Sequence, residues 1–102
     1  MASRLKLHEE LCVLLGSRNV YFQPPESLKL QYPCIVYYKS GIDKLNADDK
    51  TYKSTNEYTL TIIDHNPDTE IPDRILNHFP MCRFDRSYTS DKLNHYVLTL
   101  YY

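Results

Sequence analysis

The residues of this chain best suited to chemistry are its four histidines, because imidazole binds metal ions and exchanges protons near neutral pH. They are His8, His65, His78 and His95. His65 follows Asp64 and has Asp68 three residues on, a combination of carboxylates and imidazole that can hold a metal ion. Acidic side chains at the start of a helix have a simpler role, since they satisfy free N–H groups and favour the helix dipole. We therefore interpret Asp64 and Asp68 as structural, and we predict no metal site and no cofactor.

Motifs for nucleophilic catalysis and phosphate binding are absent from the sequence. No serine lies in a G-x-S-x-G turn, and no cysteine lies in a recognisable nucleophile motif. The only glycines are Gly16 and Gly41, which excludes the glycine-rich loops that cradle phosphates. The neighbouring acids Asp48 and Asp49 lie in a polar stretch that would not hold two carboxylates at a fixed separation. We expect the protein not to be an enzyme.

The three cysteines, Cys12, Cys34 and Cys82, lie far apart and lack the paired spacing of a structural zinc site. An odd number of cysteines without a signal peptide predicts reduced thiols that pack as small buried hydrophobes. The alternative is that one of them is an exposed thiol able to form an adventitious disulfide.

Charge and length narrow the class of protein further. The 102 residues predict one domain over 1–102, and 12 basic against 13 acidic residues leave a net charge of −1. A near-neutral chain has no basic patch for non-specific nucleic-acid binding. No apolar run approaches the roughly 20 residues of a membrane helix. The first residues, MASRLKLHEEL, lack the pattern of a signal peptide, so we expect a location in the cytoplasm of the cell that makes the protein.

Hydrophobic spacing predicts the elements that would position these residues. The expected elements are a helix over 3–15, strands over 19–22, 34–38 and 56–64, a helix over 69–78, and strands over 81–85 and 93–102. Ser3 is a candidate N-cap for the first helix and Gly16 its stop, and Asp68 or Thr69 is a candidate cap for the second. This order is typical of an α+β domain, with a mainly antiparallel sheet, an N-terminal helix and one further helix packed on it.

Two polar stretches are predicted to be irregular, a long loop over 40–53 and a turn over 86–92. Loops beyond about 12 residues are more often functional or disordered than idle. In the first stretch Ile42, Leu45 and Tyr52 stand among polar residues without the period of a helix or strand. Exposed apolar groups of this kind usually mark a contact site. These three residues are therefore candidates for an interface.

Tyrosine is the unusual feature of the composition, with ten copies and no tryptophan. Tyrosine offers a large, rigid, amphipathic contact area and is enriched at protein interfaces. On this ground Tyr37, Tyr88 and Tyr101 are further interface candidates. The alternative is a small sheet that fills its core with tyrosine and leaves the hydroxyls at the rim.

Several phrases spread over nearly the whole chain resemble one family. They are NVYFQPP over 19–25, YPCIVY over 32–37, YTLTIID over 58–64 followed by NPD over 66–68, FDR over 84–86, and DKLNH over 91–95 leading to LYY over 100–102. The set resembles small tail-completion or neck proteins of long-tailed bacteriophages and prophages, and it is similar to tail-terminator proteins. Many tail terminators are longer, so terminator, head-closure protein and another joining protein all stay open.

The resemblance implies a structural virion protein without catalytic residues. It further implies that copies of the chain, as in tail-terminator proteins, form a homomeric ring that ends tail-tube assembly and joins the tail to the head. We expect this ring to be a hexamer. The implied partners are further copies of the chain, the tail-tube protein and the head-connector protein, without specific nucleic-acid or membrane binding. The implied location is the neck of the virion, and the host cytoplasm during assembly. A different class of function, a small adaptor or regulatory module that binds proteins through its tyrosine-rich sheet, is the alternative.

Overall fold

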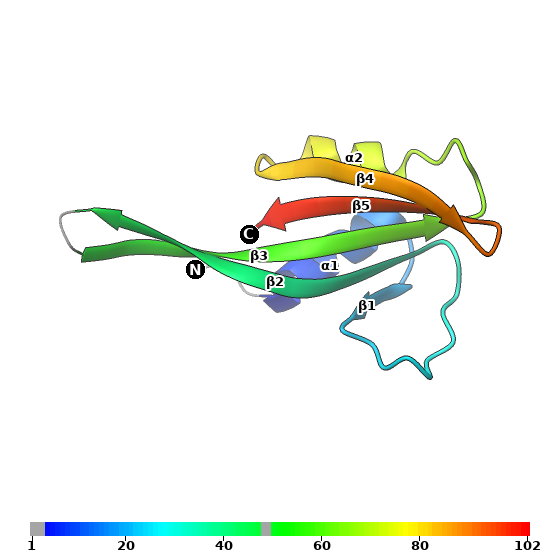
Figure 1. The fold of residues 1–102 in the computed structure, drawn as a ribbon, viewed down its shortest axis with the longest axis horizontal. Coiled ribbons are helices and arrows are strands. Elements are labelled where there is room, and N and C mark those ends of the chain that lie inside the picture. The colour runs from blue at the N-terminus through cyan, green and yellow to red at the C-terminus, as the bar shows by residue number, and fades with distance from the viewer. Residues whose placement is uncertain (1–3, 48–49) are drawn as a thin grey trace.

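The computed structural model describes residues 4–47 and 50–102, and the side chains of these residues except those of 42–55. In chain order the elements are α1 (Arg4–Leu15), β1 (Val20–Phe22), β2 (Cys34–Ala47), β3 (Lys50–Asp64), α2 (Ile71–His78), β4 (Cys82–Ser90) and β5 (Leu93–Tyr101). The strands form one five-stranded sheet in the order β1-β2-β3-β5-β4 (Figure 1). Strand β1 runs parallel to β2, and the other neighbours are antiparallel. The predicted α+β class with a mainly antiparallel sheet is confirmed.

Helix α1 forms because its leucines recur on one side. Leu7, Leu11 and Leu15 are spaced by four residues and are buried, as an amphipathic helix on a sheet requires. The helix ends at Gly16, whose φ of 86° is the left-handed conformation that favours glycine, and whose N–H donates to Cys12 O over 2.9 Å. Gly16 as the stop is confirmed, whereas the candidate cap Ser3 lies outside the described residues.

Helix α2 is shorter than predicted and begins two residues later, at Ile71. Pro72 lies in its first turn, where the missing N–H costs nothing. The N-cap is Glu70, without a side-chain capping bond, so neither Asp68 nor Thr69 caps the helix. Thr69 has a related role, because its Oγ1 accepts the N–H of Ile71 over 3.4 Å.

The core lies between the sheet and the two helices, which cover the same face (Figure 1). Strand β3 shows the period of two that was predicted for it, since Tyr58, Leu60 and Ile62 are buried against the helices. Leu98 of β5 and Ile75 of α2 belong to the same cluster. Within residues 4–47 and 50–102 no helix covers the opposite face, where a smaller cluster of Cys34, Ile63 and Leu93 packs against side chains of β1, β2 and the segment between them. The buried positions of Cys12 and Cys34 confirm the prediction for these two thiols, and Cys82 is half-buried.

The predicted loop over 40–53 is wrong. Strands β2 and β3 continue through this stretch as one antiparallel hairpin, with Ile42 opposite Asn56 and Leu45 opposite Lys53. The hairpin projects well beyond the rest of the sheet (Figure 1), and the molecule measures 50 × 26 × 23 Å. Cross-strand hydrogen bonds hold such a ribbon without apolar alternation, which is why its polar sequence was misinterpreted as a loop. We call residues 41–47 and 50–55 the arm.

The predicted turn over 86–92 is also wrong, because β4 continues to Ser90. The turn consists of Asp91 and Lys92 alone, with φ of 53° and 64°. A two-residue hairpin turn with both φ values positive matches the twist of the flanking strands. Strand β4 is exposed along nearly its whole length, so its sequence lacks the buried face by which a strand is recognised.

Candidate interaction surfaces

The arm holds three of the six predicted interface residues. Ile42 and Leu45 lie on β2 and Tyr52 on β3, at a β-bulge between Thr51 and Lys53. Their side chains lie outside the described residues. The structure thus places these three residues on paired strands and not in the predicted loop, and their role in an interface stays a prediction.

The arm leaves the sheet at a defined position. The backbone N–H and C=O of Asn56 bond with those of Tyr102 over 3.2 and 3.0 Å, and here β5 ends. Strand β1 pairs with β2 only as far as Tyr37. Gly41 of β2 is opposite Glu57 of β3, and a Cβ on Gly41 would lie only 2.8 Å from a Glu57 carboxylate oxygen. Beyond this point β2 and β3 pair only with each other in the described chain, so both outer edges of the arm carry unpaired backbone groups.

The interface prediction for Tyr37 is wrong, because its side chain is fully buried in the core. Its hydroxyl lies 2.8 Å from His8 Nδ1 and accepts a bond from Arg4 Nη1 over 3.4 Å. Its ring packs against those of Phe22 and Tyr58, with centroids 5.0 and 6.0 Å away. Burial raises the pKa of Tyr37, and burial followed by the charge of Arg4 lowers the pKa of His8. The run around Tyr37 is apolar on both faces, and only the position of α1 decides which face is inside.

Tyr88 and Tyr101 lie on the face of the sheet without helices. Tyr88 is 45% exposed, and its ring stacks on that of His95 with centroids 4.6 Å apart and planes 9° apart. Tyr101 is half-buried, and its hydroxyl donates to Glu57 Oε1 over 3.3 Å at the base of the arm. Tyr88 thus presents an accessible aromatic surface, whereas the hydroxyl of Tyr101 is engaged within the chain.

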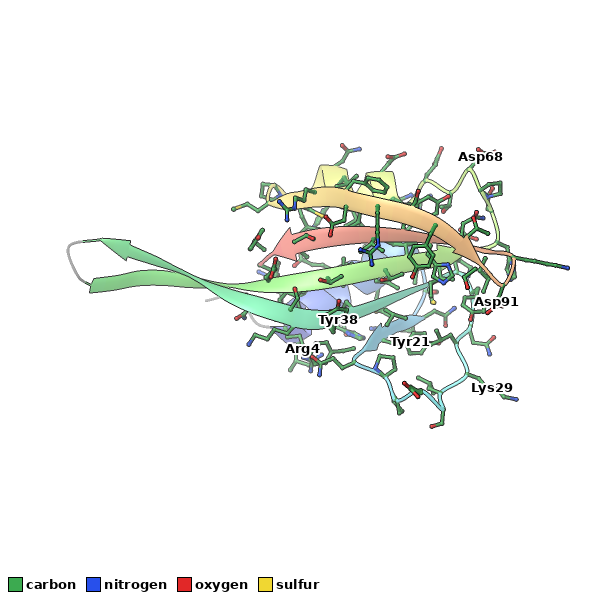
Figure 2. The ribbon with its side chains drawn as sticks, in the orientation of Figure 1. Arg4, Tyr21, Lys29, Tyr38, Asp68 and Asp91 are labelled. Atoms are coloured by element: carbon green, nitrogen blue, oxygen red, sulfur yellow. The ribbon has the colours of Figure 1, made fainter. Side chains whose placement is uncertain are left out.

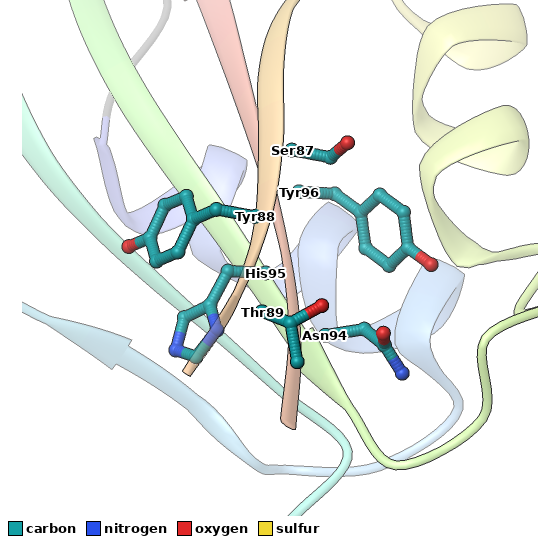
Figure 3. Close-up of a pocket in the computed structure, with 6 residues that line it drawn as sticks. All are labelled: Ser87, Tyr88, Thr89, Asn94, His95 and Tyr96. Atoms are coloured by element: carbon teal, nitrogen blue, oxygen red, sulfur yellow. The ribbon is translucent and has the colours of Figure 1, made fainter. Parts of the chain in front are cut away.

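A shallow hollow of about 240 Å³ lies along the β4–β5 hairpin (Figure 3). Figure 3 shows Tyr88 and His95 on one side of the strands and Asn94 and Tyr96 on the other. Tyr96 OH donates to Pro67 O over 3.0 Å, and Asn94 Nδ2 donates to two backbone oxygens over 3.3 Å. Because the lining groups point away from one another and the amide is occupied, the hollow lacks the convergent polar groups of a substrate site.

Of the acidic residues near His65, Asp64 has a structural role, but in the turn after β3 and not at the start of α2. The carboxylate of Asp64 accepts the N–H of Asn66 over 3.0 Å, and the side chain of Asn66 accepts the N–H of Asp68 over the same distance. The His65 ring packs edge-on against Tyr32 with centroids 5.7 Å apart. Among the side chains that the structure describes, no three His, Cys, Asp or Glu residues come together as metal ligands.

One polar cluster was not predicted, and it joins three elements. Glu10 of α1 accepts hydrogen bonds from Tyr102 OH and, over 3.1 Å, from His78 Nε2 of α2. The bond from Tyr102 lowers the pKa of Glu10, and burial together with that bond raises the pKa of Tyr102 to about 12. The ring of Tyr102 also packs edge-on against Phe79. Separations of 68 and 92 residues leave no local sequence signal for such a cluster.

No protein-family model matches this chain, and no curated protein matches its sequence significantly. Within the described residues no helix is both long and apolar enough to cross a membrane.

Proposed function

We propose that this protein is a structural subunit of a bacteriophage neck, and that copies of it form a homomeric ring where the tail joins the head. The observation that carries the proposal is the arm, which projects from the sheet with both backbone edges unpaired. The resemblance of the sequence phrases to tail-completion proteins gives the arm a context.

A projecting two-stranded ribbon is suited to binding a neighbouring subunit. A ribbon of this kind has no core of its own and is marginally stable alone in water. Packing on another chain would bury its faces and pair its edges. The arm leaves the sheet opposite the end formed by the loops of Lys29, Asp68 and Asp91 (Figure 2). In the proposed ring the arm of one subunit binds the body of the next, so the contact joins two different patches of the subunit. Such heterologous contacts generate rings when the rotation closes.

In the proposed mechanism the ring occupies the growing end of the tail tube. Bound there, it blocks the addition of further tube protein and presents a different face to the head connector. A closed ring of one subunit type, with six copies expected, fits the rotational symmetry of a tube. The chain then contributes shape and contact surface and no chemical step.

The test is genetic, in the phage or prophage that carries the gene. The key variant replaces residues 44–54 with Asn-Gly, which closes the opposed residues Asp43 and Thr55 with a two-residue turn, because the backbone groups of the next residue, Asn56, face Tyr102 and those of Thr55 therefore face β2. We expect abnormally long tails, or tails without heads, in electron micrographs of the lysate. The control is Glu26→Ser, in the exposed chain between β1 and β2.

The purified arm variant must also melt close to the unaltered protein, which shows that the body still folds. Normal tails and normal head joining with a folded arm variant would overturn the proposal. That outcome, combined with capture of a different host or phage protein, would favour the adaptor alternative.

A further inference from the structure

A second interaction surface lies at the opposite edge of the sheet from β1, along β4. This strand is the last in the sheet, so among the described strands of one chain none lies on the outer side of its backbone. Natural edge strands are usually blunted by lysine or proline, yet β4 contains neither. Phe84 and Tyr88 of this strand are 48% and 45% exposed. A long edge with exposed aromatic residues is a template for pairing with another strand.

In the first half of β4, one hydrogen bond shows which backbone groups point toward β5 and which point outward. Tyr101 N–H donates to Met81 O over 2.9 Å, which identifies these two residues as a hydrogen-bonded pair. Bonding alternates along an antiparallel ladder, so Arg83 turns its backbone N–H and C=O toward β5. Cys82 and Phe84 turn theirs outward.

In the second half of β4, the directions of the backbone groups follow from the turn that joins β4 to β5. Ser90 and Leu93 flank the two-residue turn and are opposite each other, so they form the hydrogen-bonded pair that closes the hairpin. Counting back from this pair, the backbone groups of Thr89 and Ser87 turn outward.

A β-bulge separates the two halves. Phe84 is opposite Leu98 and Arg86 is opposite Val97, so Asp85 is the extra residue. The Asp85 carboxylate accepts a bond from Thr99 Oγ1 over 3.0 Å, on the face without helices. Arg86 lies on that face too, because it pairs with Val97. The bulge thus puts two neighbouring residues of opposite charge on one face, and it reverses the alternation between the halves of the strand.

This reversal selects a single register for two antiparallel copies of β4. Opposed residues must share a face, and outward backbone groups must meet outward backbone groups. Both conditions hold in both halves only when the two bulges face each other across a two-fold axis. A bulge usually blocks an edge, because a regular strand lacks the extra residue and loses the pairing beyond it. When two bulges face each other, both strands have the extra residue at the same place, and the pairing continues on both sides. The opposed pairs are then Cys82 with Thr89, Arg83 with Tyr88, Phe84 with Ser87 and Asp85 with Arg86, one residue of each pair from each copy.

We propose that the free protein is a two-fold dimer in which β4 of one copy pairs with β4 of a second copy in this register. The two five-stranded sheets become one continuous sheet. The charges complement each other, because Asp85 of each copy lies opposite Arg86 of the other. Arg83 lies opposite the exposed ring of Tyr88, and Phe84 is covered by the neighbouring strand. A second copy therefore bonds the outward backbone groups of β4, keeps each opposed pair on one face of the sheet and places opposite charges beside each other.

This inference is independent of the proposed neck function. The dimer contact uses the same patch on both subunits, so it closes at two copies, whereas the arm lies elsewhere on the sheet. Changes in β4 test the dimer, and changes in the arm test the ring.

The first experiment measures the mass of the free protein by light scattering and its dimer dissociation by sedimentation. We expect a dimer for the unaltered chain. Arg86→Asp places two acids opposite each other twice and should weaken dimerisation by about tenfold or more. The double variant Asp85→Arg with Arg86→Asp restores opposite charges and should recover the dimer. A monomer at the highest soluble concentration, or a dimer that Arg86→Asp does not weaken, would overturn the proposal.

A backbone variant guards against effects on folding. Ser87→Pro removes an N–H that points outward, so the ladder with β5 stays complete and the melting temperature should stay close to normal. The dimer should nevertheless dissociate. The matched variant Arg86→Pro removes an N–H that faces β5 and should destabilise the fold itself. A folded Ser87→Pro protein that remains a dimer would refute β4 pairing.

The register is tested by disulfide trapping, with Cys82 replaced by Ser in every variant. Arg83→Cys with Tyr88→Cys puts opposed thiols on one face and should give an oxidised covalent dimer. Arg83→Cys alone is the control, because position 83 is not opposed to itself in the proposed register. Equal trapping of both variants would reject the register.

Discussion

Replacing Tyr102 by Phe tests the cluster that ties both helices to the end of the sheet. The change deletes one hydroxyl, which donates to the Glu10 carboxylate, and keeps the ring that packs on Phe79. A hydrogen bond to a charged group is worth about 1.5–3 kcal/mol net. The Glu10 side chain is 30% exposed and keeps His78 as a partner, so water and imidazole offset part of the loss. We therefore expect a loss of about 1–2 kcal/mol of unfolding free energy, or about 4–15 °C in Tm for a domain of this size.

The same cluster predicts how stability depends on pH. Because the folded pKa of Glu10 is lowered, its contribution is present above the unfolded pKa of about 4.3 and is lost as pH falls through the folded pKa. The pKa of Tyr102 is raised to about 12, so its contribution is complete below the unfolded pKa of about 10 and is lost as pH rises toward 12.

Urea unfolding across a pH series measures both effects. Tyr102→Phe should lower the unfolding free energy at neutral pH and should flatten its acid dependence. Glu10→Gln is the matched variant, and the two changes together should cost less than their sum, because they remove one shared bond. Strictly additive losses, or a Tyr102→Phe protein as stable as the unaltered chain at pH 7, would refute the assignment of this bond.

Three further predictions concern the arm, the β4–β5 turn and DNA. Ile42→Ser with Leu45→Ser should leave the melting temperature near normal yet impair the joining of tails to heads. The control Leu60→Ala removes a fully buried side chain and should cost about 2–5 kcal/mol of folding stability in a urea titration. If the double variant melts at as low a temperature as Leu60→Ala, Ile42 and Leu45 belong to the core. Lys92→Gly should raise the unfolding free energy by up to about 1 kcal/mol, because Lys92 holds a left-handed φ of 64°, and lower stability would contradict this account of the turn. In a titration followed by fluorescence anisotropy, double-stranded DNA should bind weakly and lose affinity with modest salt, since the net charge is −1; sub-micromolar binding at physiological salt would contradict the assembly role.

The elements of the body could be predicted because burial leaves a period in the sequence. The leucines of α1 recur every four residues, and Tyr58, Leu60 and Ile62 alternate with polar residues along β3. Each pattern reflects one covered face. The segment around Tyr37 is apolar on both faces, so its inner side depended on the position of α1 and could not be inferred locally.

The arm and the outer half of β4 were missed for the opposite reason. Their backbones pair by hydrogen bonds that any sequence can make, and β4 is exposed along nearly its whole length, so its sequence carries no pattern of a buried face. The cluster of Glu10, His78 and Tyr102 was missed because it brings together groups from three separate elements. Sequence pattern therefore located the core well, and it located poorly those edges and extensions that a single chain leaves uncovered.

The two proposed contacts have different consequences for the population of free subunits. An arm that binds a different patch on its neighbour can propagate from subunit to subunit, and it forms fibres whenever the rotation fails to close. The contact through β4 uses one patch on both copies and stops at two. In the proposed scheme excess chains collect as dimers, with the aromatic edge covered and the arms free. In this scheme the tail tube sets the rotation at which the contact between an arm and its neighbour closes a ring. Because proline on an edge strand blocks pairing with any further strand, a chain with Ser87→Pro should be a monomer that stays as soluble as the unaltered protein at high concentration, and larger aggregates of this variant would show that a contact other than β4 pairing joins the free chains.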